Sequence, residues 1–198
     1  MIIVCKKPSD VSWDSICNVL QIAHKNNEEK GFIQKTALIT GKEIAEKVSS
    51  GQCFVAMDGD KIVGTLSVAR KYKKSWFVKG EVLYYMLLGI LPEYQGRGIY
   101  SKLIAAREEY AHTHHLEVTY MFTSENNKKM QQLAQKEGFR LVSYSVSPKT
   151  NYYSVVMAKW QDKCPFPAWY CVFRYYLSMI FIRIFYKRGA VKRFQLPH

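Results

Sequence analysis

The feature that most constrains this 198-residue chain is a long hydrophobic run that leads into a glycine-rich turn. Residues 76–90 are mostly aromatic and aliphatic, and the centre of this stretch is continuously apolar instead of alternating. Such continuity is typical of a strand that is covered on both faces. Gly96 and Gly98 follow, and the pattern then predicts a helix that begins near Tyr100 or Ser101. We therefore expect a strand–turn–helix unit inside a layered α/β domain.

The remainder of the chain alternates between strand and helix patterns. An Asp-Gly turn between two β-rich runs predicts a hairpin, and Thr40 with Glu43 has the spacing of a capping box. The expected strands cover residues 2–5, 53–57, 62–69, 76–90, 118–122, 141–146 and 152–158. The expected helices cover residues 11–25, 40–48, a stretch from 100 or 101 onward, and a stretch capped by Ser124 or Asn126 that runs through Lys136. This order predicts an α/β fold in which helices flank a mixed central sheet.

Charge and cysteine content argue against several classes of protein. The formal net charge is +13, of which residues 1–158 carry +6 and residues 159–198 carry +7. Such an uneven distribution argues against a uniformly basic nucleic-acid binder, and we expect no specific nucleic-acid partner. The five cysteines include no CxxC pair and no histidine at zinc-ligand spacing, which predicts reduced thiols and no metal site. Because the first residues also lack a signal-peptide pattern, we expect a cytoplasmic protein.

The glycine-rich turn is the segment with the clearest chemical meaning. A turn that feeds a helix N-terminus gathers backbone N–H groups and the positive end of the helix dipole, which suits a phosphate. Residues 96–101 form neither a Walker loop nor a complete GxGxxG pattern. Taken by itself, the Gly-x-Gly pair is as compatible with a purely structural turn as with a phosphate site.

The surrounding sequence resembles a known family. Residues 90–104 resemble the acetyl-CoA-binding motif of the GNAT acyltransferase superfamily, Gln/Arg-x-x-Gly-x-Gly/Ala after a hydrophobic strand and a Pro-Glu pair. Asn127, followed eleven residues later by Gly138 and Phe139, is similar to the second signature of that family. The resemblance covers residues 1–160 and implies the GNAT acyl-CoA N-acyltransferase fold. Residues 161–198 then form an aromatic and basic C-terminal extension, which we expect to be helical.

The resemblance also implies a cofactor site. Backbone amides of the glycine-rich turn would hold the CoA pyrophosphate, with Arg97 and Lys102 adding positive charge. Backbone groups at the end of the preceding strand would bond the pantetheine arm and polarise the thioester carbonyl. The implied cofactor-binding residues are Gly89, Ile90, Gln95, Gly96, Arg97, Gly98, Ile99, Tyr100, Ser101 and Asn127.

Three positions depart from the family pattern. Tyr100 stands where a glycine or alanine is usual, and Ala134 replaces a tyrosine that protonates the leaving thiolate in many members. Tyr84 occupies the position of the general-base glutamate of histone-type members. Ordered water can relay the proton instead, because a CoA thiol is a tolerable leaving group. The candidate catalytic residues are Tyr84 and Glu81, with Tyr85 and Tyr144 as further candidates; sheet packing, or a surface carboxylate at Glu81, is the alternative interpretation.

The extension contains an apolar run after Pro167 and then a basic cluster. Arg174 near the middle of this run argues against a simple membrane span. Arg174 and Arg183 also fall on opposite sides of a helical wheel, so no single polar face is predicted. Three interpretations stay open: an extra helix packed on the sheet or on a partner subunit with its arginines reaching outward, a membrane-surface contact through residues 165–193, or a contribution to the acceptor pocket.

The resemblance to the GNAT superfamily implies that the protein is an N-acetyltransferase. It would move an acetyl group from acetyl-CoA to the primary amine of a small-molecule acceptor, by direct transfer in a ternary complex and without a metal. The basic body favours an acceptor with an acidic group, and a homodimer is compatible with the sequence. The alternative is a non-catalytic acyl-CoA-binding module that associates with a membrane surface or a partner through its C-terminal extension.

Overall fold

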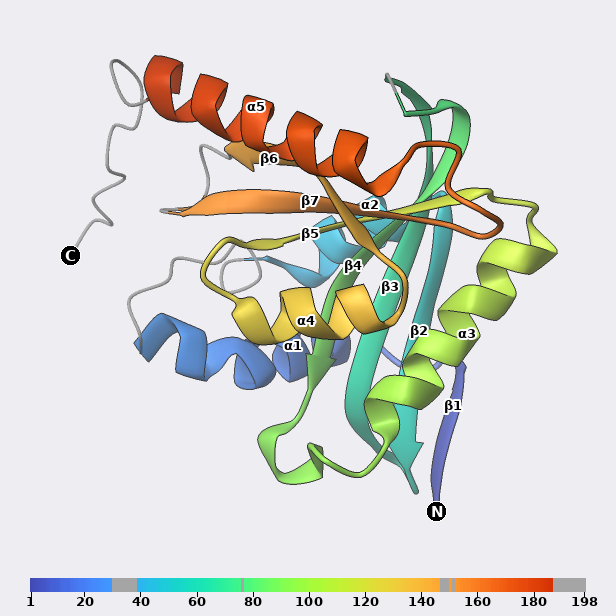
Figure 1. Cartoon of the computed structure of the whole chain (residues 1–198). Coiled ribbons are helices and arrows are strands. Elements are labelled where there is room, and N and C mark those ends of the chain that lie inside the picture. Colours follow the sequence, from blue (N-terminus) through green and yellow to red (C-terminus); the bar gives the residue numbers. More distant parts are fainter. Residues whose placement is uncertain (30–38, 76, 147–149, 151, 187–198) are drawn as a thin grey trace.

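The computed structural model describes residues 1–29, 39–75, 77–146, 150 and 152–186. Within these residues one mixed sheet has the strand order β1-β2-β3-β4-β5-β7-β6, with helices on both faces (Figure 1). This confirms the expected α/β fold. The strands are β1 (Ile2–Lys6), β2 (Gly51–Asp58), β3 (Lys61–Lys74), β4 (Lys79–Ile90), β5 (Val118–Ser124), β6 (Arg140–Val146) and β7 (Tyr153–Trp160). The helices are α1 (Trp13–Glu29), α2 (Gly41–Val48), α3 (Ile99–Thr113), α4 (Lys128–Lys136) and α5 (Ala168–Tyr186), with a short 3-10 turn at Pro92–Tyr94.

The sheet consists of two antiparallel parts that meet along a short parallel contact. Strands β1 to β4 pair antiparallel in sequence order, and β7 lies between β5 and β6. Strand β4 pairs with β5 only from Leu83 to Tyr85, opposite residues 119–121. Beyond this contact β4 continues to Ile90 and β5 to Ser124 without further pairing to each other. The sheet is therefore open between β4 and β5.

A bulge in β4 lies beside this opening. Thr65 of β3 is opposite Gly89, whereas Ser67 is opposite Met86, so two residues of β4, Leu87 and Leu88, stand opposite one residue of β3. Leu87, one of the two bulge residues, has a φ of 53°, in the left-handed region that non-glycine residues rarely adopt. Bulges of this kind bend a strand and interrupt its pairing. The bulge thus accounts for the divergence of β4 from β5.

Several local predictions are confirmed and some boundaries are corrected. The capping box between Thr40 and Glu43 is present, and Gly59, with a φ of 58°, forms the tight turn between β2 and β3. The N-cap of α4 is Asn127, not Ser124 or Asn126, because the Asn127 side chain accepts the backbone N–H of Met130 at 3.0 Å. Helix α1 runs to residue 29 and β3 to residue 74, both longer than expected. Trp76 lies outside the described residues.

Two hydrophobic layers hold the helices against the sheet. Helices α3 and α4 contribute Leu103 and Ala134 to the larger layer, and α1 and α2 contribute Leu20 and Ile44 to the layer on the opposite face. All four side chains are fully buried. Helix α1 approaches β4 so closely that a Cβ added to Gly89 would lie 3.1 Å from the Leu20 side chain. The end of β4 therefore lies directly beneath α1.

The C-terminal extension forms α5, which runs along the free edge of β6 (Figure 1). The backbone N–H of Tyr144 in β6 donates to Ser178 Oγ of α5 at 2.8 Å, which satisfies part of an otherwise open strand edge. The extension is thus an extra helix packed on the domain, but Arg174 faces the domain and does not reach outward as expected. In the described part of the chain, no helix combines the length and the apolar character needed to cross a bilayer.

Candidate active site

The turn before α3 presents backbone N–H groups to solvent. Gly96 and Gly98 both adopt left-handed conformations, with φ of 80° and 74°, and nothing lies within 4 Å of a Cβ added at either position. Gly98 is the N-cap of α3 and supplies no side chain to bond the first N–H groups of the helix. The first N–H groups of a helix lack partners within it, and the helix dipole adds positive potential there. The turn therefore has the geometry of an anion-binding site.

Side chains around the turn hold it in place. Gln95 Nε2 donates to the carbonyl of Ile90 at 3.3 Å, which connects the turn to the end of β4. The Arg97 guanidinium lies 4.9 Å from the centre of the Tyr94 ring and remains exposed beside the glycines. Ile99 is buried and anchors the start of α3, and Ser101 is exposed in its first turn.

Lys102, which was expected near the phosphate, is directed elsewhere. Its ammonium group donates to the backbone carbonyl of Ile2 in β1 at 2.8 Å. Arg97 is thus the basic side chain that stays at the turn itself. The positive potential there comes mainly from backbone N–H groups and the helix terminus.

Tyr100 does not cover the turn, because its side chain extends toward α4. Its hydroxyl donates to Glu137 Oε1 at the C-terminal end of α4. Burial and the nearby Glu137 carboxylate raise the pKa of Tyr100 well above the usual range for tyrosine. The hydroxyl is therefore protonated at neutral pH and serves as a hydrogen-bond donor between two helices.

A buried arginine completes this contact between α3 and α4. Arg107 is fully buried, donates to Glu137 Oε2 at 2.9 Å, and also forms an ion pair with Glu108. Its guanidinium lies 4.8 Å from the ring centre of Tyr85 and 5.2 Å from that of Phe139. Such a buried cation persists only because carboxylates and ring faces surround it.

The Gly-Phe pair of the second family signature has a structural role in this network. Gly138, with a φ of 93°, ends α4, and the N–H of Phe139 donates a hydrogen bond to the carbonyl of Ala134 at 3.0 Å. This is the usual way in which glycine terminates a helix. Phe139 is then buried against Arg107, while Asn127 at the other end of α4 is exposed. The two ends of this signature thus position α4 beside the opening of the sheet.

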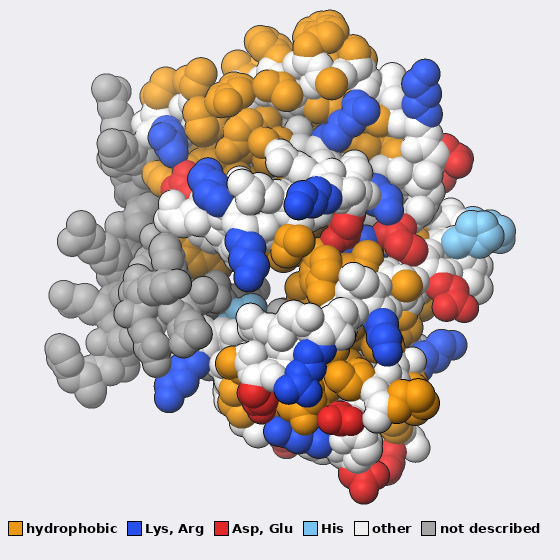
Figure 2. Space-filling model, turned by 60° about the horizontal axis from the view of Figure 1, so that its bottom comes forward, with side chains coloured by type: hydrophobic (Ala, Val, Ile, Leu, Met, Phe, Trp, Pro, Cys, Tyr) orange, Lys and Arg blue, Asp and Glu red, His pale blue; other side chains and the backbone are white. Residues whose placement is uncertain are grey.

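The opening itself is visible as a hollow in the middle of the face shown in Figure 2. Gly89 and Ile90 at the end of β4 lie on one side of the divergence, and the N-terminus of α4 follows directly after β5 on the other. Sequence reasoning missed one residue here. His24 of α1 places Nε2 2.9 Å from the carbonyl oxygen of Leu88, which is one of the two bulge residues. No motif contains His24, and only the packing of α1 on β4 brings it to this position.

Tyr84 is not close to the glycine-rich turn. It precedes Gly89 by five residues in β4, or about 17 Å along the strand. Its ring stacks on Tyr120 and Phe122, with centroid distances of 5.9 Å in both cases, and its hydroxyl accepts from Lys73 Nζ at 3.4 Å. The structure therefore places Tyr84 in an aromatic cluster on the α1 face of the sheet.

The other proton-transfer candidates are also held in separate contacts. Glu81 is exposed and lies 3.9 Å from Arg70, eight residues or about 26 Å along β4 from Gly89. Tyr144 donates its hydroxyl to Glu125. Tyr85 faces the opposite layer, under Arg107, where burial raises its pKa far above the usual range for tyrosine.

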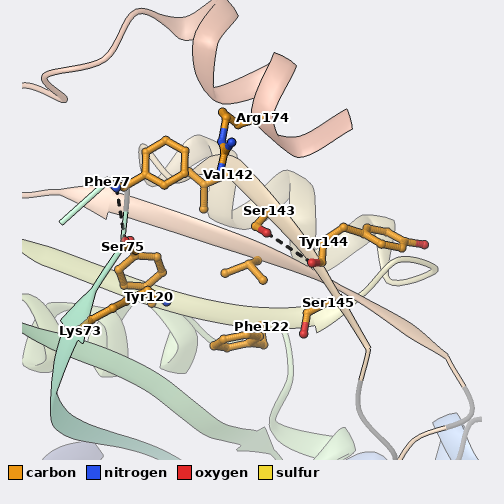
Figure 3. A pocket seen from close by; sticks show the side chains of 11 residues that line it. Lys73, Ser75, Phe77, Tyr120, Phe122, Val142, Ser143, Tyr144, Ser145 and Arg174 are labelled. Atoms are coloured by element: carbon orange, nitrogen blue, oxygen red, sulfur yellow. Dashed lines mark hydrogen bonds between the residues drawn. The ribbon is translucent and has the colours of Figure 1, made fainter. Parts of the chain in front are cut away.

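A cavity of about 280 Å³ lies on the same face of the sheet as Tyr84, below the start of α5 (Figure 3). Lys73 and Arg174 bring positive charge to it, and no described lining residue is acidic. Burial raises the pKa of Tyr120 to about 12, so its hydroxyl stays protonated. The lining residues are Lys73, Ser75, Phe77, Tyr120, Phe122, Val142, Ser143, Tyr144, Ser145, Val156 and Arg174. A cationic cavity with aromatic walls can take a small molecule that has an anionic group.

Metal sites need a group of ligating side chains and reactive thiols need a particular environment, and the described residues bear on both. No three His, Cys, Asp or Glu side chains in those parts of the chain come together as a metal-binding group. All five cysteines are free thiols. Burial raises the pKa of Cys17 and Cys53, although hydrogen bonds from Ser67 and Thr65 partly oppose the effect at Cys53. Buried thiols with raised pKa values are poor nucleophiles.

The described residues thus form a mixed sheet that opens between β4 and β5, beside a turn with the geometry of an anion-binding site. The sequence model of the acetyltransferase (GNAT) family matches residues 13–139, which include β4, the turn, α3 and α4. The chain therefore belongs to the GNAT acetyltransferase family. The matched segment ends before β6, so β6, β7 and α5 lie outside it.

Solved structures share this fold. A protein from Pyrococcus horikoshii is 24% identical, with a TM-score of 0.62 over 82% of this chain and 100% of that chain. A GNAT acetyltransferase from Streptococcus agalactiae is 14% identical, with a TM-score of 0.65 over 82% and 96% of the two chains. A GNAT acetyltransferase from Elizabethkingia anophelis, solved with acetyl-CoA bound, is 14% identical, with a TM-score of 0.57 over 80% and 97%. No curated protein sequence matches the chain.

Proposed function

We propose that this protein transfers an acetyl group from acetyl-CoA to the primary amine of a small acceptor. One observation carries the proposal: β4 and β5 separate after three paired residues, and the left-handed glycine turn lies just beyond the end of β4. The opening exposes strand ends to which an extended pantetheine arm could bond, and the turn offers N–H groups to a diphosphate. Membership of the GNAT family supports the same assignment.

The residues present fit acetyl-CoA as the co-substrate. The backbone N–H groups from Gly96 to Tyr100 would hold the pyrophosphate, because neither glycine has a side chain and the space before each is open. Gly89 and Ile90 would bond the pantetheine arm, and Asn127 would contact the arm from the start of α4. When bound, acetyl-CoA supplies an acetyl group activated as a thioester. The chain needs only to orient that group, polarise its carbonyl and accept a proton.

Direct transfer from the thioester to the amine is favoured over a covalent acyl-cysteine. Cys17, Cys53 and Cys171 are buried and have raised pKa values, and no cysteine lies in the turn or in β4. Backbone N–H groups at the β4 bulge are the proposed donors to the thioester carbonyl oxygen, since the bulge interrupts pairing to β3 at Leu87 and Leu88. Both substrates would then be bound together before transfer.

Proton removal from the amine has two candidate acceptors on the α1 face of the sheet. His24 places an imidazole nitrogen beside the bulge, and Tyr84 lies three residues before Leu87 in β4, about 10 Å along the strand. His24→Gln and Tyr84→Phe, compared by the pH dependence of kcat, separate them. The acceptor residue is the one whose replacement lowers kcat by about 10²–10⁴-fold and removes one limb of the pH profile. Unchanged profiles in both variants assign proton transfer to water.

The cavity of Figure 3 is the proposed acceptor site. Phe122 in its wall follows the last β5 residue paired to β4, so one end of the cavity lies at the opening, whereas Lys73, opposite Gly80 of β4, lies at the far end. Lys73 Nζ lies 4.2 Å from the Tyr120 ring centre and Arg174 enters from α5, so an extended acceptor with its anionic group far from its amine and an apolar body between them would be favoured. We expect Lys73→Gln and Arg174→Gln each to raise KM for a carboxylated amine about tenfold, with little change for its neutral amide. Lys74→Gln is the matched control, because Lys74 is an exposed lysine next to Lys73 in sequence that does not line the cavity. Equal effects on both acceptors would contradict this assignment.

A non-catalytic acyl-CoA-binding module is the second candidate. Ala134 is fully buried where many family members have a tyrosine, so this position offers no proton to a leaving thiolate. Calorimetric titration with acetyl-CoA, combined with a free-thiol assay over a panel of amines, distinguishes the two candidates. Binding with thiol release supports the enzyme, binding without release from any amine supports the module, and absence of binding excludes both.

A further inference from the structure

Helix α5 is apolar on both of its faces, but only one face is covered. The residues that pack toward the domain recur at helical spacing from Cys171 to Ile182 and include the polar side chains Arg174 and Ser178. The residues between them point away from the domain. Soluble helices normally place apolar residues inward and polar residues outward. Helix α5 keeps its mid-helix polar groups inside and exposes hydrophobic ones.

The exposed face is large and aromatic. Trp169, Phe173, Tyr176, Phe181 and Phe185 are 52–69% exposed, and four aliphatic side chains between them are 45–51% exposed. With about 200 Å² for each aromatic side chain, the five aromatic residues alone expose roughly 600 Å². That area matches the upper end of the largest apolar patch on a typical monomer, before the aliphatic residues are counted. Figure 2 shows hydrophobic side chains gathered at the top of the molecule, the end where α5 lies.

The charge of this segment is complementary to an anionic surface. Residues 163–198 contain seven Lys and Arg and no Asp or Glu. Four of these basic residues, Lys187, Arg188, Lys192 and Arg193, follow α5 directly in sequence. Arg183, at the border of the exposed face, is neutralised by Glu125 at 2.9 Å and so does not place an unpaired charge in the apolar face. An apolar helix face beside a basic cluster is the pattern of a helix that lies in the headgroup region of anionic lipids.

We propose that α5 docks the protein on the surface of an anionic lipid bilayer. The aromatic side chains of the exposed face insert at the boundary between headgroups and acyl chains, and the basic residues after the helix bind the lipid phosphates. The helix lies along the surface and does not cross the membrane, in agreement with its length and composition.

A second copy of the chain is the competing occupant, and charge argues against it. Pairing two α5 helices face to face would bring together two chains whose sequence after the helix has four basic residues, Lys187, Arg188, Lys192 and Arg193, and no acidic ones. Like charges oppose such a contact, whereas an anionic leaflet attracts the same residues. The aromatic side chains, with an apolar body and, for Trp169 and Tyr176, a polar group, also suit the lipid–water boundary.

Vesicle sedimentation of the full chain tests the proposal. The probes are vesicles of phosphatidylcholine alone and of phosphatidylcholine with 30% phosphatidylglycerol. We expect at least tenfold tighter binding to the anionic vesicles, weakened by salt. The double variant Phe173→Ser/Phe181→Ser should lose at least tenfold in affinity. Tyr72→Ser is the matched control, because Tyr72 is an equally exposed aromatic residue on β3 that lies outside the patch.

A second variant tests the charges without touching the helix. Replacing Lys187, Arg188, Lys192 and Arg193 by Gln should reduce binding to anionic vesicles and abolish most of its salt dependence. Thermal unfolding followed by circular dichroism checks that every variant is folded. Failure of the intact chain to bind anionic vesicles, or binding that Phe173→Ser/Phe181→Ser leaves unchanged, would overturn the proposal. A dimer in sedimentation velocity that this double variant dissociates, without vesicle binding, would assign the face to a second copy.

Discussion

Replacing Gly98 by Asn and by Asp separates backbone strain from charge at the turn before α3. Gly98 has φ and ψ of 74° and 4°, and a Cβ added there would meet nothing within 4 Å. Neither side chain therefore clashes, and both residues tolerate the left-handed region better than other non-glycine residues. We expect each variant to lose about 1 kcal/mol of stability, which lowers Tm by roughly 2–4 °C in a chain of this length.

The two variants should differ strongly in their affinity for CoA. The Asp and Asn side chains have nearly the same size, so the two variants differ in the carboxylate charge and in the amide N–H donors of Asn. At about 5 Å from a bound phosphate, and at an effective dielectric constant between 20 and 80, the repulsion is about 1–3 kcal/mol. This corresponds to a Kd about 5- to 150-fold higher for Gly98→Asp than for Gly98→Asn.

Isothermal titration calorimetry with CoA at low and high ionic strength measures this difference. The ratio of the two Kd values should shrink as salt screens the repulsion. Thermal unfolding of both variants serves as the control, since similar Tm values show that strain is matched. Kd values within twofold of each other at low salt would refute the placement of the pyrophosphate at this turn.

Three further predictions concern the contact between α3 and α4. Tyr100→Phe should lose about 1–2 kcal/mol of stability and leave the Kd for CoA within twofold, because the hydroxyl points to Glu137; a tenfold change in Kd would show that the ring covers the cofactor path. Glu137→Ala should cost about 3 kcal/mol in urea unfolding, because it removes a carboxylate from the buried Arg107; a loss under 1 kcal/mol would show that Glu108 alone compensates. Burial raises the pKa of Glu108, but Arg107 and Lys159 outweigh it, so the folded-state pKa lies below the usual 4.5. The ionised form of Glu108 thus stabilises the fold above about pH 4.5, and this contribution fades as the pH falls further. Glu108→Gln should therefore reduce the difference between the unfolding free energies at pH 7 and pH 3. An unchanged difference would contradict a lowered pKa for Glu108 in the folded state.

Most of the fold could be predicted because its signals are local. The continuous apolar run of β4, the Asp-Gly hairpin and the capping box at Thr40 each depend on residues within one element and its ends. Boundaries were less accurate where neighbouring candidates compete. Asn127 caps α4 in place of Ser124 or Asn126, a choice that depends on how the chain leaves β5.

Only the backbone of the candidate site could be predicted from the sequence. Gly96 and Gly98 predict a turn before a helix from sequence, and the structure shows this turn with both glycines in left-handed conformations. Side-chain directions were not accessible in this way. Lys102 turns to β1 and Tyr100 to α4, because partners far away in sequence hold them there. His24 reaches the β4 bulge for the same reason and belongs to no motif.

The C-terminal helix shows most clearly what sequence and tertiary structure each decide. The sequence by itself determined that residues 168–186 form an apolar, aromatic segment beside basic residues, because composition and periodicity are properties of the segment alone. It also left Arg174 and Arg183 on opposite sides of a helix, without an uninterrupted apolar face. Packing on β6 removed this ambiguity: Arg174 faces the cavity and Arg183 pairs with Glu125, so the remaining surface is hydrophobic. Only tertiary contacts decide which side of a helix is covered, because the partners that cover it come from distant parts of the chain.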